Sequence, residues 1–286
     1  MADQEVVADV FCVTAGLVGK QPIGFNSWRT MTDKTEGRDK FAKVMQYGSR
    51  FWAWYLLSAN NKSEVGQKFY KLYLLTQLSR KCFRVMKVIN EVDKLNDTLK
   101  KKNEMEPWLL TVNVLKHLGI SAFWIFDNMV YFNEANMSPL ERATALKYEA
   151  RGWFISSIAG IVSFVTDMTL NCNRRSTLLN QLDGEANHER RLCLEAQIEK
   201  LSRMQFKNFL LLIKSTCDML CSANMPGLCI PEKVWGEKFN DGVVGLLGVV
   251  SGTATCLTLW PDRPLAAAAV PVALVGAHAA GHAKAA

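Results

Sequence analysis

The chain has 286 residues, enough for one or two domains with a buried core. Apolar residues make up 49% and charged residues 21%, which is too apolar for general disorder and too charged for a transporter built from lipid-facing helices throughout. The formal net charge is +7, and the excess is local, because residues 33–104 hold 16 Lys and Arg against 8 Asp and Glu. This basic region favours an anionic partner, such as a lipid headgroup layer, a nucleic acid or an acidic protein.

The chain ends and the cysteines indicate a cytosol-facing protein. Met1 to Val10 contains no basic residue, unlike a secretory signal, and the last residues differ from a Ser-Lys-Leu address. The eight cysteines form no Cys-x-x-Cys pair and most lie in apolar stretches. This usage is typical of reduced cysteines.

Helix signals follow one another from residue 33 onward. Asp33 or Thr35 can cap a helix that runs to about Leu57, and Ser63 can begin a second one. Apolar residues at 3-4 spacing in that second helix predict a seam against a partner helix in a bundle, with Asn96 at the remaining seam position. The seam consists of Leu75, Leu78, Cys82, Val85, Ile89, Val92 and Leu99.

Three further helices are predicted after residue 106. One runs from Pro107 to Phe132. The cap signals Ser138, Pro139 and Glu141 begin the next, which continues to about Leu182. A charged helix then grows apolar up to Leu220, and sustained period-two alternation is absent, so the fold class is all-α, a helical bundle.

Gly242 to Trp260 is the strongest candidate for a membrane span. It has 19 residues without a charge, close to the roughly 20 that cross a bilayer. Its small residues Gly245, Gly248 and Gly252 predict close helix packing and self-association. Residues 152–166 are short for a span and fit a buried bundle helix equally well, and residues 107–132 fit a bundle or membrane-surface helix. The chain thus divides into an N-terminal extension (1–32), an amphipathic and helical bundle region (33–225), and a connector, transmembrane helix and alanine-rich tail (226–286).

The helix from Arg38 to Leu57 carries the clearest functional pattern. Its bulky apolar residues form one stripe, with basic residues opposite or at the edges, as interfacial insertion into an anionic leaflet requires. The same stripe also fits the core face of a bundle helix. The candidate lipid-binding residues are Arg38, Lys40, Phe41, Lys43, Val44, Met45, Gly48, Arg50, Phe51, Trp52 and Tyr55.

Catalysis finds little support in the sequence. We find no Walker loop, Rossmann glycine fingerprint, nucleophile elbow or His-Glu-x-x-His motif. His278 and His282 lie one turn apart, as do Cys217 and Cys221, but neither pair has further ligands nearby. We therefore expect no enzyme activity, no cofactor and no metal, and, without a nucleic-acid module, no nucleic-acid partner.

Four segments, taken in order, resemble the peroxin-11 family. Residues 33–50 are similar to its opening amphipathic helix, including Asp39-Lys40 and Gln46-Tyr47. Residues 79–84 resemble its second basic helix and Phe126-Asp127-Asn128 its Asp-Asn element. Residues 242–251 are similar to its glycine-rich membrane segment.

The resemblance implies a peroxisomal membrane protein with most of its chain facing the cytosol. It implies that the Arg38–Leu57 helix elongates the membrane and promotes peroxisome division, which controls peroxisome number and size. The implied partners are anionic lipids, further copies of the chain, fission adaptors, a dynamin-related GTPase and a peroxisomal membrane-protein import receptor. Two alternatives stay open: a pore-forming channel for small metabolites, supported by Lys116, Asp127 and Asp167 within apolar stretches, and a soluble helical adaptor.

Overall fold

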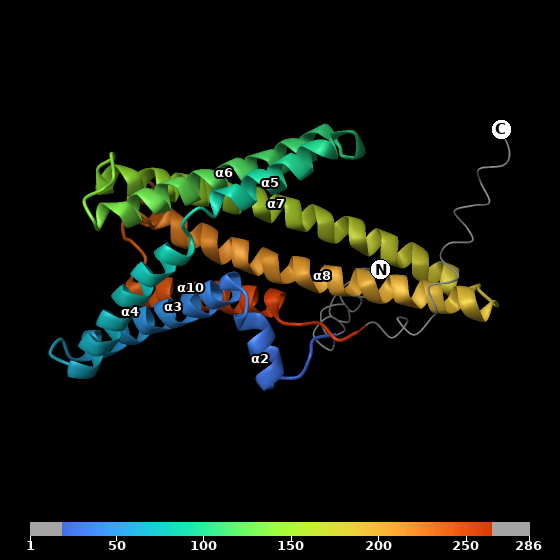
Figure 1. The fold of residues 1–286 in the computed structure, drawn as a ribbon, viewed down its shortest axis with the longest axis horizontal. Coiled ribbons are helices and arrows are strands. Elements are labelled where there is room, and N and C mark those ends of the chain that lie inside the picture. The colour runs from blue at the N-terminus through green and yellow to red at the C-terminus, as the bar shows by residue number, and fades with distance from the viewer. Residues whose placement is uncertain (1–18, 265–286) are drawn as a thin grey trace. The chain divides into compact units, whose positions relative to one another are not determined.

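The computed structural model describes residues 19–264 (Figure 1). These residues form nine α-helices and one 3₁₀ turn, with no β-strand among them, which confirms the all-α prediction. Lys20 and Asp262 pair as an isolated bridge. The helices are α2 (Phe25–Thr32), α3 (Thr35–Ala59), α4 (Glu64–Phe83), α5 (Val88–Lys100), α6 (Pro107–Asn133), α7 (Arg142–Asp183), α8 (His188–Ala223), α9 (Ile230–Trp235) and α10 (Asp241–Leu259), with the 3₁₀ turn at Lys102–Glu104.

The chain separates into two compact units. The main unit comprises Pro22–Met168 and Lys207–Pro261, and it contains every predicted site residue. The second unit comprises Thr169–Phe206 and the described residues up to Gln21 and from Asp262. Within the second unit, Arg203 donates a hydrogen bond to the Arg263 carbonyl at 2.5 Å, and Lys20 pairs with Asp262 at 2.8 Å. Both α7 and α8 continue from one unit into the other.

The hairpin of α3 and α4 begins the main unit. Helix α3 starts at Thr35 and its N-cap is Lys34, so neither predicted cap residue, Asp33 or Thr35, caps it, and no side chain does. Ser63 does cap α4, because its hydroxyl accepts a hydrogen bond from the Gly66 N–H at 3.1 Å. Helix α10 packs along α3, and Figure 1 shows the two side by side.

The predicted heptad seam is wrong in two respects. The helix breaks between Phe83 and Val88, where Met86 adopts a left-handed conformation with φ 62°, so α4 and α5 are separate. The seam residues also lie mostly at the surface, where Leu75 is 66% exposed and Val92 53% exposed. Basic residues face inward instead, as described below. A heptad pattern indicates an apolar face, and within residues 19–264 no partner helix covers that face.

Helices α6 and α7 cross at two glycines. A Cβ atom on Gly119 would lie 2.9 Å from the Gly152 carbonyl oxygen, so the backbones touch where neither residue has a side chain. The predicted cap at Ser138 is wrong, because its hydroxyl closes a turn with the Leu140 backbone and α7 begins at Arg142. Asn240 caps α10 by accepting from the Val243 N–H at 2.9 Å.

Three helices in the described residues are long and apolar enough to cross a membrane: α6, α7 and α10. The C-terminal candidate α10 matches the predicted span within one residue at each end. The other two exceed the prediction, which gave a bundle or membrane-surface helix for residues 107–132 and left residues 152–166 open between a span and a bundle helix. Only 28% of the apolar window in α6 and in α7 is buried, so much of their apolar surface is left for lipid.

Candidate functional site

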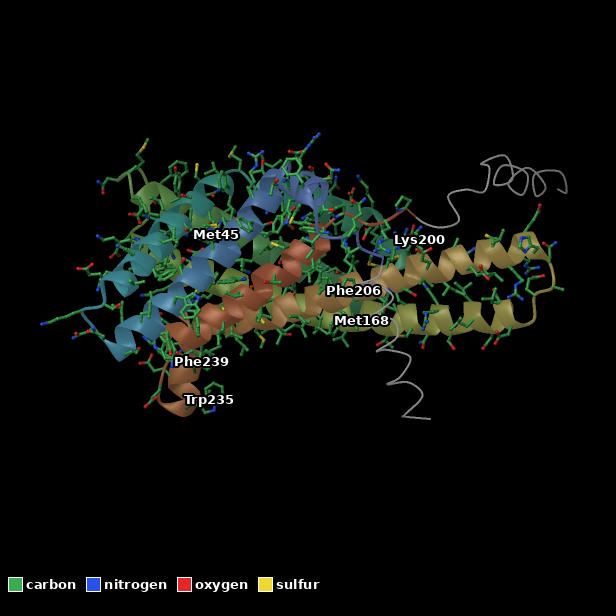
Figure 2. The ribbon with its side chains drawn as sticks, turned by 90° about the horizontal axis from the view of Figure 1, so that it is seen from below. Met45, Met168, Lys200, Phe206, Trp235 and Phe239 are labelled. Carbon is green, nitrogen blue, oxygen red and sulfur yellow. The ribbon has the colours of Figure 1, made fainter. Side chains whose placement is uncertain are left out.

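Helix α3 has an exposed apolar face and a buried polar one. Four bulky side chains of the predicted stripe stand at the surface, as Met45 does in Figure 2. Their exposed fractions are 41% for Phe41, 41% for Met45, 47% for Trp52 and 53% for Tyr55. Val44, Gly48 and Phe51 are half-buried, in contact with α10. The outer stripe is therefore not a core face of the described bundle, and it offers apolar area for lipid or a partner.

Aromatic rings extend this surface at both ends of α3. Trp52 packs edge-on against Tyr55, with ring centroids 5.8 Å apart. At the other end, Trp28 of α2 packs edge-on against Phe41 at 5.7 Å and against Trp260 at 5.1 Å. Trp28 is 40% exposed and belongs to the apolar surface. It lies in residues 1–32, which were expected to be an N-terminal extension. Because it is a single residue outside any periodic pattern, the sequence did not predict that it belongs to the apolar surface.

The basic residues predicted to meet headgroups are mostly buried, which corrects the proposed orientation. Arg38 alone is exposed, and its Nε donates to the Thr32 carbonyl at 2.7 Å. Lys40 and Lys43 are 8% and 6% exposed, and Arg50 pairs with Asp241 at 2.5 Å. Burial lowers the pKa of Lys40 to about 7, although Asp39 at 3.2 Å acts in the opposite direction. Projection of one helix could not show this, because most of the partners come from distant segments.

Lys43 joins three helices. Its ammonium lies 2.8 Å from the Asp218 carboxylate on α8 and donates to Ser251 of α10 at 2.6 Å. Ser251 in turn donates to Asp218 at 2.5 Å, and Lys214 adds a second ion pair at 3.2 Å. Burial opposes the Asp218 charge, but Lys43 and Lys214 outweigh it and hold the carboxyl pKa well below its usual range. The charges are therefore paired as buried charges must be.

A second buried cluster joins α3, α4, α6 and α7. Arg80 donates to Asp39 at 3.0 Å and to the Gln46 side chain at 2.5 Å. Lys81 pairs with Asp127 and, at 3.6 Å, with Glu149, while Arg84 lies 3.4 Å from Asp127. Asp39 and Asp127 are 1% and 0% exposed. The sequence singled out residues 79–84 through resemblance, and Asp127 through resemblance and as a charge within an apolar stretch, but no local pattern indicates that they meet.

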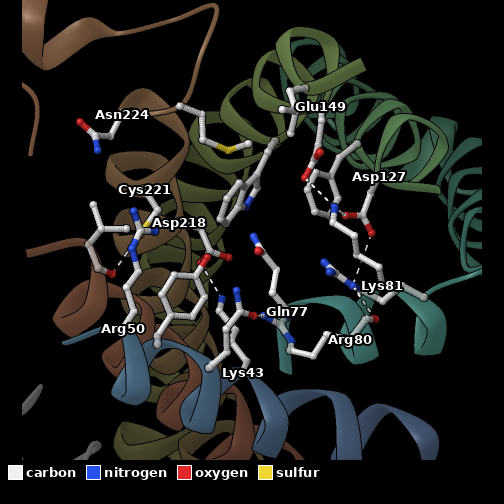
Figure 3. Close-up of a pocket in the computed structure, with 18 of the residues that line it drawn as sticks. Lys43, Arg50, Gln77, Arg80, Lys81, Asp127, Glu149, Asp218, Cys221 and Asn224 are labelled. Carbon is white, nitrogen blue, oxygen red and sulfur yellow. Dashed lines mark hydrogen bonds and ion pairs between the residues drawn. The ribbon is translucent and has the colours of Figure 1, made fainter. Parts of the chain in front are cut away.

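A cavity of ≈370 Å³ lies between the two clusters, within the main unit (Figure 3). Figure 3 shows Lys43, Arg50 and Asp218 on one side of it, Lys81, Asp127 and Glu149 on the other, and Gln77 with Arg80 between. Its wall also includes the aromatic residues Phe123 and Trp124. Eight basic residues line it: Lys40, Lys43, Arg50, Arg80, Lys81, Arg84, Arg142 and Lys214. The unit therefore has a polar, cation-rich interior under an apolar exterior.

The glycine face of α10 serves contact within the chain. A Cβ atom on Gly248 would lie 2.0 Å from the Tyr47 ring, and one on Gly245 would lie 2.8 Å from the Phe51 backbone. Gly252 faces Val44 in the same way. The face predicted for self-association at Gly245, Gly248 and Gly252 is thus occupied by α3 of the same chain. Self-association itself stays a prediction.

The predicted pairs of metal-ligand residue types do not form a site in the part the structure describes. Cys217 and Cys221 are buried and free, and no group of three or more His, Cys, Asp or Glu residues among the described positions could hold a metal. His278 and His282, like the alanine-rich tail, lie outside the described residues.

Comparison with known proteins gives a consistent result. The family model for peroxisomal biogenesis factor 11 (PEX11) matches residues 25–260. Peroxisomal membrane protein 11 homolog of Dictyostelium discoideum is 20% identical, over 80% of this chain and 91% of that protein. Peroxisomal membrane protein 11D of Arabidopsis thaliana is 26% identical over 81% and 90%, and protein 11-5 of Oryza sativa subsp. japonica is 27% identical over 80% and 90%.

No solved structure matches. The family match begins within α2 and ends one residue after α10, so it covers the main unit, with its outer stripe and its charged interior, and the Thr169–Phe206 part of the second unit. The chain belongs to the peroxisomal biogenesis factor 11 family.

Proposed function

We propose that this protein resides in the peroxisomal membrane and elongates it, which promotes peroxisome division and sets peroxisome number and size. One observation carries the proposal: α3 keeps its polar face inside the main unit and its aromatic stripe outside. An apolar face that stays uncovered while lysines are buried suits a helix whose outer surroundings are lipid. The names of its relatives, peroxisomal membrane proteins, support the membrane.

The stripe acts as a wedge at the acyl boundary of one leaflet. Phe41, Met45, Trp52 and Tyr55 are each about half-exposed, and each would contribute about 1 kcal/mol on leaving water. Side chains that enter one leaflet expand it relative to the other, which favours curvature. Because α10 packs along α3 next to the exposed stripe, against Val44, Gly48 and Phe51, a membrane-spanning helix would hold the wedge at the surface.

Anionic lipids attract the unit through basic residues other than those first predicted. Arg38 remains a candidate, and Lys62, Lys68 and Lys71 on and before α4 are exposed. Each lysine or arginine near an anionic leaflet contributes about 1 kcal/mol, screened by salt. We further propose that most of the chain faces the cytosol, where copies of the chain, fission adaptors, a dynamin-related GTPase and the import receptor can reach it.

The test compares full-length variants reconstituted into liposomes that contain anionic lipid. Phe41→Asp with Trp52→Asp places two charges in the stripe and should abolish tubules in electron micrographs. Ser58→Asp with Asn61→Asp adds the same charge at exposed positions in the last turn of α3 and just after it, and should tubulate like the wild type. Equal tubulation by both double variants would overturn the wedge.

A second candidate function is a channel for small metabolites, and the charged cavity favours it. Three helices of the described chain are long and apolar enough to span, and the ≈370 Å³ cavity offers polar walls that a lumen needs. Conductance of the full chain in a planar bilayer tests this function. Currents that change selectivity in Asp127→Asn and persist in the stripe variant would establish it separately from the wedge.

A further inference from the structure

The charges around the cavity do not balance. Eight basic residues line it, and the carboxylates that line it or pair with those residues number six: Asp39, Asp127, Glu134, Glu149, Asp218 and Asp241. Each basic residue has a carboxylate within 4.0 Å, but Asp39, Asp127 and Asp218 are each shared by two or more of them, so the set carries a net formal charge of +2. A net charge removed from water is costly, so an anion in the cavity would stabilise the unit.

Hydrogen-bond donors are also left without acceptors there. Trp124 lines the cavity and is 6% exposed, and its buried indole N–H has no acceptor among the described residues. Arg84 uses only its Nε, which donates to the Arg80 carbonyl at 3.0 Å and lies 3.4 Å from Asp127. Both terminal nitrogens of its guanidinium thus have no acceptor within residues 19–264. Because buried donors are normally paired, these point to an acceptor ligand.

The donors are held in place by packing. The Arg84 guanidinium lies over the rings of Phe123 and Trp124, at 5.9 and 5.6 Å from their centroids. Phe123 and Trp124 pack against each other at 4.7 Å. A planar guanidinium fixed by aromatic faces presents its fork in one orientation, which suits the oxygens of a phosphate better than a mobile lysine does.

We propose that the cavity of the main unit binds a phosphate-type dianion, which offsets the net charge of +2 around the cavity and accepts hydrogen bonds from Trp124 and Arg84. The cavity volume, ≈370 Å³, falls in the range of small-molecule sites, roughly 300–1,000 Å³, so the phosphate can carry an organic group. The same chemistry occurs in a soluble phosphate ester and in the headgroup of phosphatidic acid. Binding of this ligand is independent of the outer stripe and of any transport.

The test measures phosphate binding to the full chain, purified in a neutral detergent and free of phosphate. Equilibrium dialysis with radiolabelled inorganic phosphate, at an ionic strength held constant with chloride, should show saturable binding of about one phosphate per chain. Trp124→Phe replaces the indole with a smaller aromatic ring that has no N–H, so it should weaken binding about tenfold. Trp235→Phe is the matched control, because Trp235 is 67% exposed on α9 and does not line the cavity.

Competition separates the two sources of the ligand. Glycerol phosphate and short-chain phosphatidic acid are added against labelled phosphate, with short-chain phosphatidylcholine as control. Displacement by glycerol phosphate alone assigns a soluble ester, and displacement by phosphatidic acid but not phosphatidylcholine assigns a lipid headgroup. Binding that does not exceed the chloride background, or equal affinity of the Trp124→Phe and Trp235→Phe variants, would overturn the proposal. Neither result would change the tubulation expected in the liposome experiment, so the two proposals can fail separately.

Discussion

The ion pair between Lys43 and Asp218 joins residues 175 positions apart in the chain. The side chains are 7% and 4% exposed, so the pair is almost fully removed from solvent. Such a pair contributes little by itself, because the attraction mainly offsets the cost of desolvating two charges. Its effect appears when one partner is removed and the other stays buried.

We expect Asp218→Leu to destabilise the protein by about 3–5 kcal/mol, because it leaves Lys43 buried without its carboxylate. Lys43→Met combined with Asp218→Leu should recover most of that loss. Thermal unfolding in detergent measures both. Lys214→Met serves as control, since the Lys214 side chain is 28% exposed and its removal should cost about 1 kcal/mol or less. A double variant as unstable as Asp218→Leu would contradict this account.

Glu91 gives a pH-dependent contribution at the α5–α6 contact. Burial raises its pKa, but hydrogen bonds from His117 and Lys94 outweigh burial and lower the pKa to about 2. Stability from Glu91 is therefore present above the ordinary pKa of 4.5 and is lost as pH falls towards 2. We expect Glu91→Gln to flatten the fall in melting temperature over this range. Asp93→Asn, at an exposed position on the same helix, should leave the fall unchanged.

At the scale of elements, helix positions could be predicted and helix orientations could not. Caps, prolines and uncharged runs place α3, α6, α10 and the start of α4 within a few residues, since these signals are local. The direction of each apolar face depends on its surroundings, and the rule that apolar faces turn inward holds only in water. For this reason the sequence predicts that the seam on α4 and α5 lies in a core. In the structure, Arg80, Lys81 and Arg84 occupy that core instead. The cavity was not predicted, because its walls come from six helices, α3, α4, α6, α7, α8 and α10.

Contact between α3 and α10 depends on the glycine face of α10. Gly248→Ala would push a methyl group to 2.0 Å from the Tyr47 ring, so we expect a loss of about 2 kcal/mol in unfolding free energy. Gly184→Ala is the control, because a Cβ atom there meets nothing within 4 Å. Thermal unfolding and cross-linking of the same samples test this. Unchanged stability together with lost cross-links would instead assign the glycines to self-association.

At the scale of the whole molecule, the main unit inverts the usual distribution of polarity. Bulky apolar residues of α3, α4 and α5 are exposed, whereas Asp39, Arg80 and Asp127 are almost completely buried. A water-soluble unit of this kind would lose stability on both counts. Lipid around the exterior removes the cost of exposing apolar side chains. Ion pairing in the interior offsets the cost of burying charged side chains. The arrangement therefore supports a membrane role independently of family membership.

Quenching by brominated lipids measures this inversion directly. In liposomes, Trp52→Phe should reduce the fraction of tryptophan fluorescence that brominated acyl chains quench, because Trp52 is 47% exposed on the stripe. Trp124→Phe should leave the quenched emission unchanged, since Trp124 is 6% exposed inside the unit. The reverse result would mean that the unit turns its charged side outward in lipid.

The buried pair of Lys81 and Asp127 also constrains the order in which the protein assembles. Alone in a bilayer, α6 would carry an unpaired Asp127, at a cost of about 3 kcal/mol near the centre. A chain that begins at Met105 should therefore resist integration, measured by carbonate extraction, and Asp127→Leu should restore it. Helix α4 is synthesised before α6 and supplies the cation Lys81. We therefore expect the hairpin of α3 and α4 to assist the insertion of α6 into the membrane.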